Sequence, residues 1–389
     1  MRIINYFFKH FHRTLAQVFR SLVTCIAILL TCYPAFAIVD ALEDSAPRTD
    51  QGIKGLLLDI EQVDKRLITV GERGHILYSD DQGNTWQQAN VPVRVTLTAI
   101  TFSSASNGWA VGHDGVILAT RDGGVNWLKQ LDGYQANQLI ENELKRLLAL
   151  SDEQRTAQDI GYSVEQLNYL LEDAELFTDE GASRPFLEVL FVDEQVGLAV
   201  GAYGMNFRTE DGGENWRPLV ANSSNPDNFH LNTLIKSRDT LYIAGEAGSL
   251  YRSDDKGLSW MILPSPYDGP FFGMSVSYTA TETEVLVVYG LRGNAFISTN
   301  QGQKWSRLSV GSDTSILGSV AMTPSEFILL SSGGELFRFN LDGQLTGRGL
   351  TPDRSALSSG LISSDNELLL VGVNGMTYLN LPKIQWEAP

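Results

Sequence analysis

Cysteine and histidine are scarce in this chain of 389 residues. Its two cysteines, Cys25 and Cys32, both lie in the first 37 residues, so the rest of the chain cannot form a disulfide. Beyond that segment the histidines are His75, His113 and His230, with no His-x-x-x-His pair among them. Because zinc and related metals need clustered Cys and His ligands, the sequence predicts no metal site.

Acidic residues are missing from the first 37 residues, which carry Arg2, Lys9, Arg13 and Arg20. An apolar run from Leu22 to Tyr33 follows, and then Ala35-Phe36-Ala37. This order predicts a secretory signal peptide over residues 1–37, cleaved after Ala37. The apolar run is short for a membrane span, and the bulky Thr31 before Cys32 disfavours lipidation, so a membrane-anchored or lipoprotein form is the less favoured alternative. We expect an exported, periplasmic protein.

Positive charge is also scarce. The chain has 29 Lys and Arg against 46 Asp and Glu, a net charge of −17, which becomes −21 without the four basic residues of the first 37. Such a surface repels nucleic acid and anionic lipid, so neither is expected as a partner. The 352 residues left after cleavage are enough to bury a core without disulfides.

What the chain has in abundance is one repeated octet. SDDQGNTW at residue 79 recurs as TRDGGVNW at 120, TEDGGENW at 209, SDDKGLSW at 253 and STNQGQKW at 298. Each copy follows a Gly-x-x-Gly turn whose second glycine precedes the tryptophan by twelve residues, as Gly74 precedes Trp86. Two weaker copies, around Gly334 and Gly375, bring the total to seven; in the last, Trp386 comes after eleven residues.

Between these turns the sequence has the pattern of short strands, as in HLNTLIKS, TLYIAG and SLYRSD. Four strands in each unit of about 40 to 45 residues are typical of propeller blades. We predict an all-β fold, a seven-bladed β-propeller over residues 56–389, with residues 38–55 as an N-terminal lead-in. With strands A to D running outward, the octet joins C to D on one face and the Gly-x-x-Gly turn joins B to C on the other.

The octet is interpreted as a structural turn. Ser79 and Asp81 can hold backbone amides, Gly83 can take a positive φ, and Trp86 can pack between blades. Five equivalent copies do not make one catalytic constellation, so no catalytic residue is predicted. The corresponding structural residues in the other copies are Asp122, Trp127, Asp211, Trp216, Asp255, Trp260 and Trp305. The Gly-x-x-Gly turns join strand to strand, unlike a phosphate-binding loop, and no cofactor is predicted.

One interval between tryptophans, from Trp127 to Trp216, is about fifty residues too long. We place the insertion at residues 134–183, between blades two and three, where it carries eleven acidic and three basic residues. Apolar residues at helical spacing and two capping boxes, Ser151 with Gln154 and Ser163 with Gln166, predict helices. Because it joins strand D to strand A, the insertion is expected on the face of the Gly-x-x-Gly turns. It could be functional or merely packed on the ring.

These residues carry a family resemblance. Ser79, Asp81, Gly83, Thr85 and Trp86 match the Asp-box, or BNR repeat, of sialidases and other propellers. The longer unit WAVGHDGVILATRDGGVNW more closely resembles the propellers of photosystem II assembly and stability factors. The resemblance implies a seven-bladed, non-enzymatic propeller that helps a membrane complex assemble, in a photosynthesis-related family. It also implies an arginine-lined patch, whereas this chain is acidic and has a helical insertion, so its client need not be a photosystem.

The function predicted is therefore that of an exported, non-enzymatic scaffold whose partner is a protein client of a membrane complex. Its candidate binding residues lie in the Gly-x-x-Gly turns: Glu72, Arg73, His113, Asp114, Tyr203, Glu246 and Arg292. The alternative is a sialidase-like glycoside hydrolase or a glycan-binding propeller. The Phe/Tyr-Arg-Ile-Pro motif that opens a sialidase is absent before the first unit, which favours the scaffold.

Overall fold

The computed structural model describes residues 39–158, 160–220, 225–363 and 366–388. The predicted signal peptide, residues 1–37, lies outside them. The chain divides into two compact units, Met1–Asp40 and Ala41–Pro389, and nearly all the described residues belong to the second. None of the helices described is both long and apolar enough to cross a membrane.

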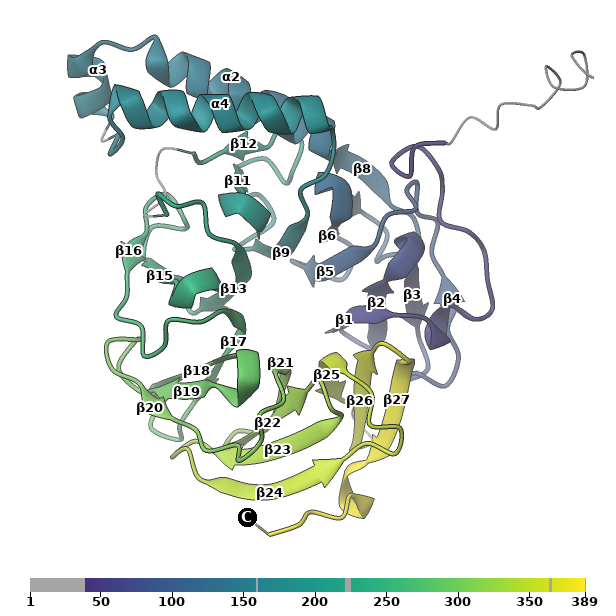
Figure 1. Cartoon of the computed structure of the whole chain (residues 1–389). Helices are drawn as coiled ribbons and strands as arrows, with labels where there is room; N and C mark the ends of the chain where they lie inside the picture. Colours follow the sequence, from purple (N-terminus) through teal and green to yellow (C-terminus); the bar gives the residue numbers. More distant parts are fainter. Residues whose placement is uncertain (1–38, 159, 221–224, 364–365, 389) are drawn as a thin grey trace, which may run out of the picture. The chain divides into compact units, whose positions relative to one another are not determined.

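The second unit is a ring of seven antiparallel sheets, which confirms the predicted seven-bladed propeller (Figure 1). Blade 1 contains β1 (Leu57–Val63), β2 (Arg66–Gly71), β3 (Ile76–Ser79) and β4 (Gln87–Gln88). Blade 2 contains β5 (Leu97–Phe102), β6 (Gly108–Gly112), β7 (Ile117–Thr120) and β8 (Leu128–Leu131). Blade 3 contains β9 (Phe186–Phe191), β10 (Gly197–Gly201), β11 (Asn206–Thr209) and β12 (Arg217–Pro218).

The remaining blades follow in chain order. Blade 4 contains β13 (Leu231–Ser237), β14 (Thr240–Gly245), β15 (Leu250–Ser253) and β16 (Met261–Ile262). Blade 5 contains β17 (Phe271–Tyr278), β18 (Glu284–Gly290), β19 (Ala295–Ser298) and β20 (Ser306–Arg307). Blade 6 contains β21 (Ile316–Thr323), β22 (Glu326–Ser331), β23 (Glu335–Asn340) and β24 (Leu345–Leu350). Blade 7 contains β25 (Leu357–Ile362), β26 (Glu367–Gly372) and β27 (Gly375–Asn380).

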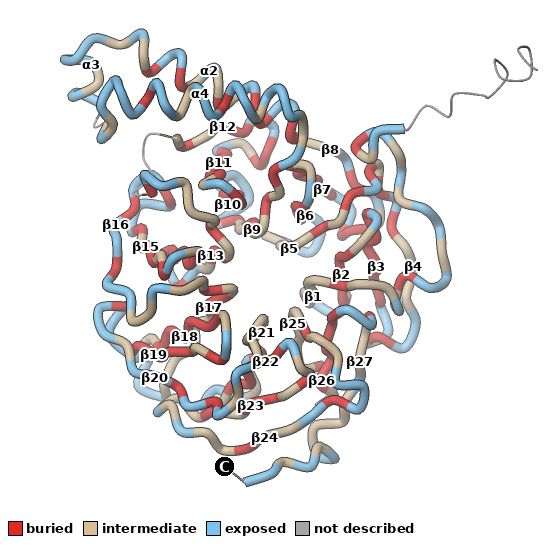
Figure 2. The backbone as a smooth tube through the Cα atoms, in the orientation of Figure 1, coloured by how far each residue is buried: buried red, intermediate tan, exposed pale blue. Residues whose placement is uncertain are grey.

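The core lies between the blades rather than inside any one of them. The second strand of each blade is buried almost throughout, since neighbouring blades pack on both its faces (Figure 2). One apolar cluster, for example, joins Ile68 and Val70 of blade 1 to Ala110 and Trp127 of blade 2. Such continuous apolar strands explain how a chain without disulfides can hold a ring together.

Blade 7 differs from the prediction of four strands, because its described residues form three. The chain turns away after β27 through a 3₁₀ turn, η7 (Leu381–Lys383), and Glu387 pairs instead with Arg348 in β24 of blade 6. The backbone N–H and C=O of these two residues exchange hydrogen bonds of 3.0 and 2.9 Å. Trp386 still packs against blade 6, as the other tryptophans pack against the blade before their own.

Among the described residues no strand is shared between the first and last blades, and side chains link them where the ring closes. Ser358 Oγ of β25 donates to the carbonyl oxygen of Leu57 (2.9 Å), and Ser359 Oγ donates to Asp59 of β1 (2.9 Å). The lead-in contributes as well: Ala46 pairs with Val91 through the backbone, and the short turn η1 (Gly52–Lys54) contacts β27.

The insertion forms three helices, α2 (Gly133–Leu148), α3 (Asp152–Ala157) and α4 (Val164–Glu180). Both predicted capping boxes are present, with Ser151 and Ser163 as N-caps, and a third begins α2 at Asp132. Ile140, Leu144 and Leu147 face the ring, as their spacing predicts. Val164, at the start of α4, is 44% exposed.

Candidate interaction face

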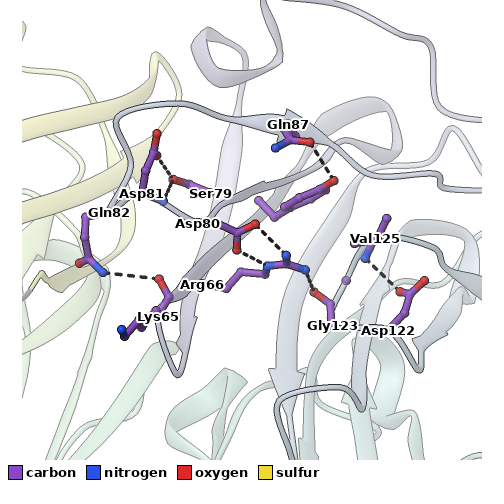
Figure 3. A network of polar contacts seen from close by, with 12 residues as sticks. Lys65, Arg66, Ser79, Asp80, Asp81, Gln82, Gln87, Asp122, Gly123 and Val125 are labelled. Atoms are coloured by element: carbon purple, nitrogen blue, oxygen red, sulfur yellow. Dashed lines mark hydrogen bonds and ion pairs between the residues drawn. The ribbon is translucent and has the colours of Figure 1, made fainter.

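The octet acts as a lock on the turn between strands C and D. In blade 1 the Ser79 hydroxyl accepts from the Gly83 N–H (2.9 Å) and donates to Asp81 (2.8 Å), as Figure 3 shows in part. Asp81 also accepts from the N–H of Thr85 (2.8 Å) and from its hydroxyl (2.6 Å). Arg66 pairs with Asp80 and donates to the carbonyl oxygen of Gly123 in blade 2 (Figure 3). The polar groups of this turn are thus engaged with backbone and with each other.

The same hydrogen bonds recur in blades 2, 3 and 4. They centre on Thr120 with Asp122, Thr209 with Asp211, and Ser253 with Asp255. The pKa of Asp81 is lowered, first because the Thr85 hydroxyl donates to it. Burial alone would raise the pKa of Asp122, but hydrogen bonds from Asn126 and Thr120 outweigh it and the pKa falls. Carboxylates held in this way serve the turn rather than a substrate.

The tryptophans that end the octets lie between blades. Trp127 and Trp216 are 3% and 5% exposed, and the Nε1–H of Trp127 donates to Gly124 (3.0 Å). Trp109 in β6 is also fully buried and stacks on Phe191. The box residues therefore contribute to packing and turn geometry.

The Gly-x-x-Gly turns form short 3₁₀ turns on the other face. They are η2 (Glu72–Gly74), η3 (His113–Gly115), η4 (Ala202–Gly204), η5 (Glu246–Gly248) and η6 (Leu291–Gly293). The first glycine is required by close approach, since a Cβ on Gly71 would lie 2.0 Å from the Leu56 carbonyl oxygen. The second, Gly74, has φ +72°, which L side chains rarely adopt. We call the surface formed by these five turns the Gly-turn face.

The residue before the second glycine is unusual in all five turns. It has φ between +52° and +56° in every case, yet it is never glycine or asparagine: the five residues are Arg73, Asp114, Tyr203, Ala247 and Arg292. This left-handed conformation disfavours a side chain by roughly 1–2 kcal/mol. Its effect is to project the side chain from the turn, and Arg73, Tyr203, Ala247 and Arg292 are exposed. Four of these five blades therefore display a side chain at an equivalent place: arginine in blades 1 and 5, tyrosine in blade 3 and alanine in blade 4.

The predicted binding residues divide into two groups. Glu72 and Glu246 fold back onto their own blades, where their carboxylates accept from the N–H groups of Leu56 (3.4 Å) and His230 (3.2 Å). Both thus hold the entry to strand A. The other five are His113, Asp114, Arg73, Tyr203 and Arg292, and they are spread over blades 1, 2, 3 and 5 rather than gathered in one pocket.

The insertion lies on the Gly-turn face. A Cβ on Gly133, at the start of α2, would meet the Asp114 carbonyl oxygen at 2.6 Å. Phe177 of α4 packs on Tyr203 with ring centroids 5.2 Å apart, and Tyr203 packs in turn on His230 (4.9 Å). Figure 1 shows α2 and α4 lying alongside β11 and β12 of blade 3. The two candidate surfaces inferred from the sequence are therefore continuous at blade 3.

Sequence reasoning missed a cluster of acids in the central channel. The innermost strands of all seven blades line a cavity of about 390 Å³, and Asp59 and Glu188 face it. Burial raises the pKa of Asp59, and it raises the pKa of Glu61, two residues along β1, to about 8. Burial, with repulsion from Asp59 and Glu61, also raises the pKa of Glu188. The sequence sign of this cluster was the presence of acidic residues within the predicted innermost strands.

The channel bears on the sialidase-like alternative. Tyr289 lines it. Burial, together with repulsion from Glu188 and Asp59, raises the pKa of Tyr289 to about 12. A sialidase active site also combines a tyrosine with an acidic residue, as the channel does. It differs in having arginines that bind the carboxylate of the substrate. Among the described residues, the channel lining contains no arginine or lysine. The channel therefore lacks the cationic side chains that would hold the carboxylate of an anionic sugar.

The ring of seven antiparallel sheets and the repeated box turns define an Asp-box β-propeller. The model of the family described as photosynthesis system II assembly factor YCF48 matches residues 78–153 and 172–348, more than half of the chain. The chain belongs to this family. The stretch between the two matched parts, residues 154–171, covers most of α3 and the first turns of α4.

Three relatives show how far the likeness extends. The photosystem II assembly lipoprotein Ycf48 of Synechococcus sp. (strain CC9902) is 27% identical over 122 residues, which are 31% of this chain and 35% of that protein. A solved structure of YCF48 bound to D1 peptide has a TM-score of 0.55 at 17% identity, covering 84% of this chain and 93% of its own. YCF48 from Cyanidioschyzon merolae gives 0.56 at 17%, covering 87% and 99%. At these identities the structures show the shared fold.

Proposed function

We propose that this protein is an exported, non-enzymatic scaffold that binds a protein client of a membrane complex through its Gly-turn face. The observation that carries the proposal is the set of non-glycine residues in left-handed conformation, one in each of five successive blades. Backbone strain of this kind is frequent at functional sites, and here it repeats on the face that also carries the insertion. Arg73, Tyr203 and Arg292 are exposed on one face, which the acidic insertion extends.

The relatives support a protein client. One structure in this family is described as bound to D1 peptide, and the Synechococcus relative is named as an assembly lipoprotein. The relatives are assembly factors rather than enzymes. The insertion and the acidic surface of this chain favour a client with a basic surface, which need not belong to a photosystem.

Substituting the displayed residues tests the proposal. The triple variant Arg73→Ala, Tyr203→Ala and Arg292→Ala is expected to lose a defined client from pull-downs of solubilised membranes, with little change in folding. The matched control is Gln82→Ala, Lys256→Ala and Gln301→Ala on the opposite face, where these residues have φ of 58° to 60° in the box turns. Equal client capture by the two triple variants and the native protein would refute the proposed face.

The hydrolase alternative has its own measurement. Hydrolysis of a fluorogenic sialoside that disappears on Tyr289→Phe substitution would replace the scaffold by an enzyme. We expect no turnover, because the described lining of the channel has no arginine or lysine to hold the substrate carboxylate.

A further inference from the structure

A groove separates the insertion from blade 3 on the Gly-turn face. It has a volume of about 330 Å³, within the range of ligand sites, and its walls come from α2, α4, η4 and β11. Leu144, Leu170, Phe177 and Met205 supply apolar surface. At its edge Leu176 is 61% exposed and extends this apolar surface.

The groove also contains a buried donor that nothing described in the structure satisfies. Arg184 is 6% exposed, and its Nη2 donates to Asn137 Oδ1 (2.7 Å). Its guanidinium lies 4.1 Å from the centroid of the Phe177 ring. Its Nε–H, however, has no acceptor among the described residues. Burial lowers the pKa of Arg184 to about 10, partly offset by Glu180, so this side chain is charged at neutral pH.

A buried acceptor in the same groove is also unsatisfied. Asn206 is 5% exposed, and its Oδ1 has no donor among the described residues. A buried donor or acceptor left unpaired destabilises the fold. The fold does not demand a polar residue at this place. Two residues after the second glycine, five of the six other blades have an apolar residue, and blade 7 has Thr377; the five are Ile76, Ile117, Leu250, Ala295 and Leu336.

The rim of the groove is acidic. Asp173, Glu180 and Asp227 line it, and all three are exposed. Three carboxylates around one buried guanidinium disfavour a free carboxylate ligand and favour a cationic one. The groove therefore offers an apolar wall, one donor, one acceptor and a negative rim.

We propose that the groove binds a peptide segment of the client, with an apolar side chain against Leu170, Leu176 and Met205 and a flanking lysine or arginine at the acidic rim. A main-chain amide of the segment accepts from the Arg184 Nε–H through its carbonyl oxygen and donates to Asn206 Oδ1 through an N–H. An amide supplies both missing partners in an otherwise apolar contact. This inference rests on the proposed scaffold function and names the chemistry of its partner.

The experiment uses the full chain and capped peptides, because acetyl and amide caps remove terminal charges. Calorimetric titration would compare acetyl-Gly-Lys-Leu-Leu-Lys-Gly-amide with the same peptide carrying glutamate for lysine, and with the uncapped carboxylate form. We expect the capped lysine peptide to bind at least about 10-fold more tightly than the glutamate peptide. Failure of the lysine peptide to bind, or preference for glutamate, would overturn the inference.

Asn206→Leu separates binding from stability. Since leucine occupies this position in blades 4 and 6, the variant is expected to keep or raise its thermal midpoint while losing about 10-fold in affinity for the lysine peptide. The control is Asn168→Leu, the same change at an exposed position of α4 outside the groove. Unchanged affinity in Asn206→Leu, or loss of affinity together with a lower midpoint, would contradict a role for the amide.

Asp173→Lys tests the acidic rim without touching the buried pair. It is expected to weaken the lysine peptide and strengthen the glutamate peptide, and equal effects on both would argue against charge selection. These outcomes are distinct from failure of the proposed function. If a variant with only Arg73→Ala and Arg292→Ala, which lie outside the groove, loses its client while Asn206→Leu binds peptide normally, the scaffold stands and the groove proposal falls.

Discussion

At the scale of single residues, the polar side chains of each box turn bind the turn backbone, and its tryptophan packs between blades. Asp81 accepts two hydrogen bonds from Thr85, and Trp86 donates to Gly83. These contacts could be predicted from the octet because they are local in sequence. The difference between Asn206 and the aliphatic residues at this position in most other blades was visible in the sequence. Its role could not be predicted, because the groove that it lines is formed by α2 and α4.

Trp127 gives the residue-scale prediction. Its ring fills the space between blades 1 and 2, so Trp127→Ala should lower the free energy of unfolding by roughly 3–5 kcal/mol. The neighbouring Leu128 is 73% exposed, and Leu128→Ala should change the free energy of unfolding by about 0.5 kcal/mol or less. Urea unfolding followed by fluorescence measures both. A small effect at Trp127 would mean that the box tryptophans are not structural.

At the scale of elements, the last blade is where the repeat fails. The shortened spacing to Trp386 was the one sequence sign that blade 7 would not match the others. In the structure the segment that would form its fourth strand crosses to β24 instead. The helices of the insertion were predictable from their capping boxes, whereas the groove that they form with blade 3 depends on long-range packing of α4 against η4.

The contact between blade 7 and blade 1 is testable at Tyr378. Its hydroxyl donates to the carbonyl oxygen of Gly83 (2.8 Å) and accepts from Trp86 Nε1 (2.8 Å), so it links the two ends of the ring. Tyr378→Phe should therefore reduce the free energy of unfolding by about 1 kcal/mol. Tyr169→Phe on α4, where the side chain is 61% exposed, serves as the control and should have no measurable effect. Thermal or urea unfolding would reveal the difference, and equal stabilities would show that this link does not hold the ring.

At the scale of the whole molecule, the number of blades and their faces followed from one spacing repeated around the chain. The position of the insertion on the Gly-turn face followed from strand parity, and the structure agrees. The central channel did not follow, because strands far apart in sequence bring Asp59, Glu61 and Glu188 together only when the ring closes. No local pattern marks such a meeting of like charges.

The cluster of acids in the channel predicts how the stability of the protein depends on pH. The pKa of Glu61 is raised to about 8, and those of Asp59 and Glu188 are raised too, so the folded state holds protons that the unfolded state releases above about pH 4.5. The free energy of unfolding should therefore fall as pH rises from about 5 to about 8.

Glu61→Gln cannot lose this proton, so it should be more stable than the native protein at pH 8 and similar to it at pH 5. The control Glu165→Gln, at an exposed site on α4, should keep the native pH dependence. Urea unfolding at the two pH values decides the matter. If the free energy of unfolding of Glu61→Gln falls between pH 5 and pH 8 as much as that of the native protein, titration of Glu61 is not the cause of the pH dependence.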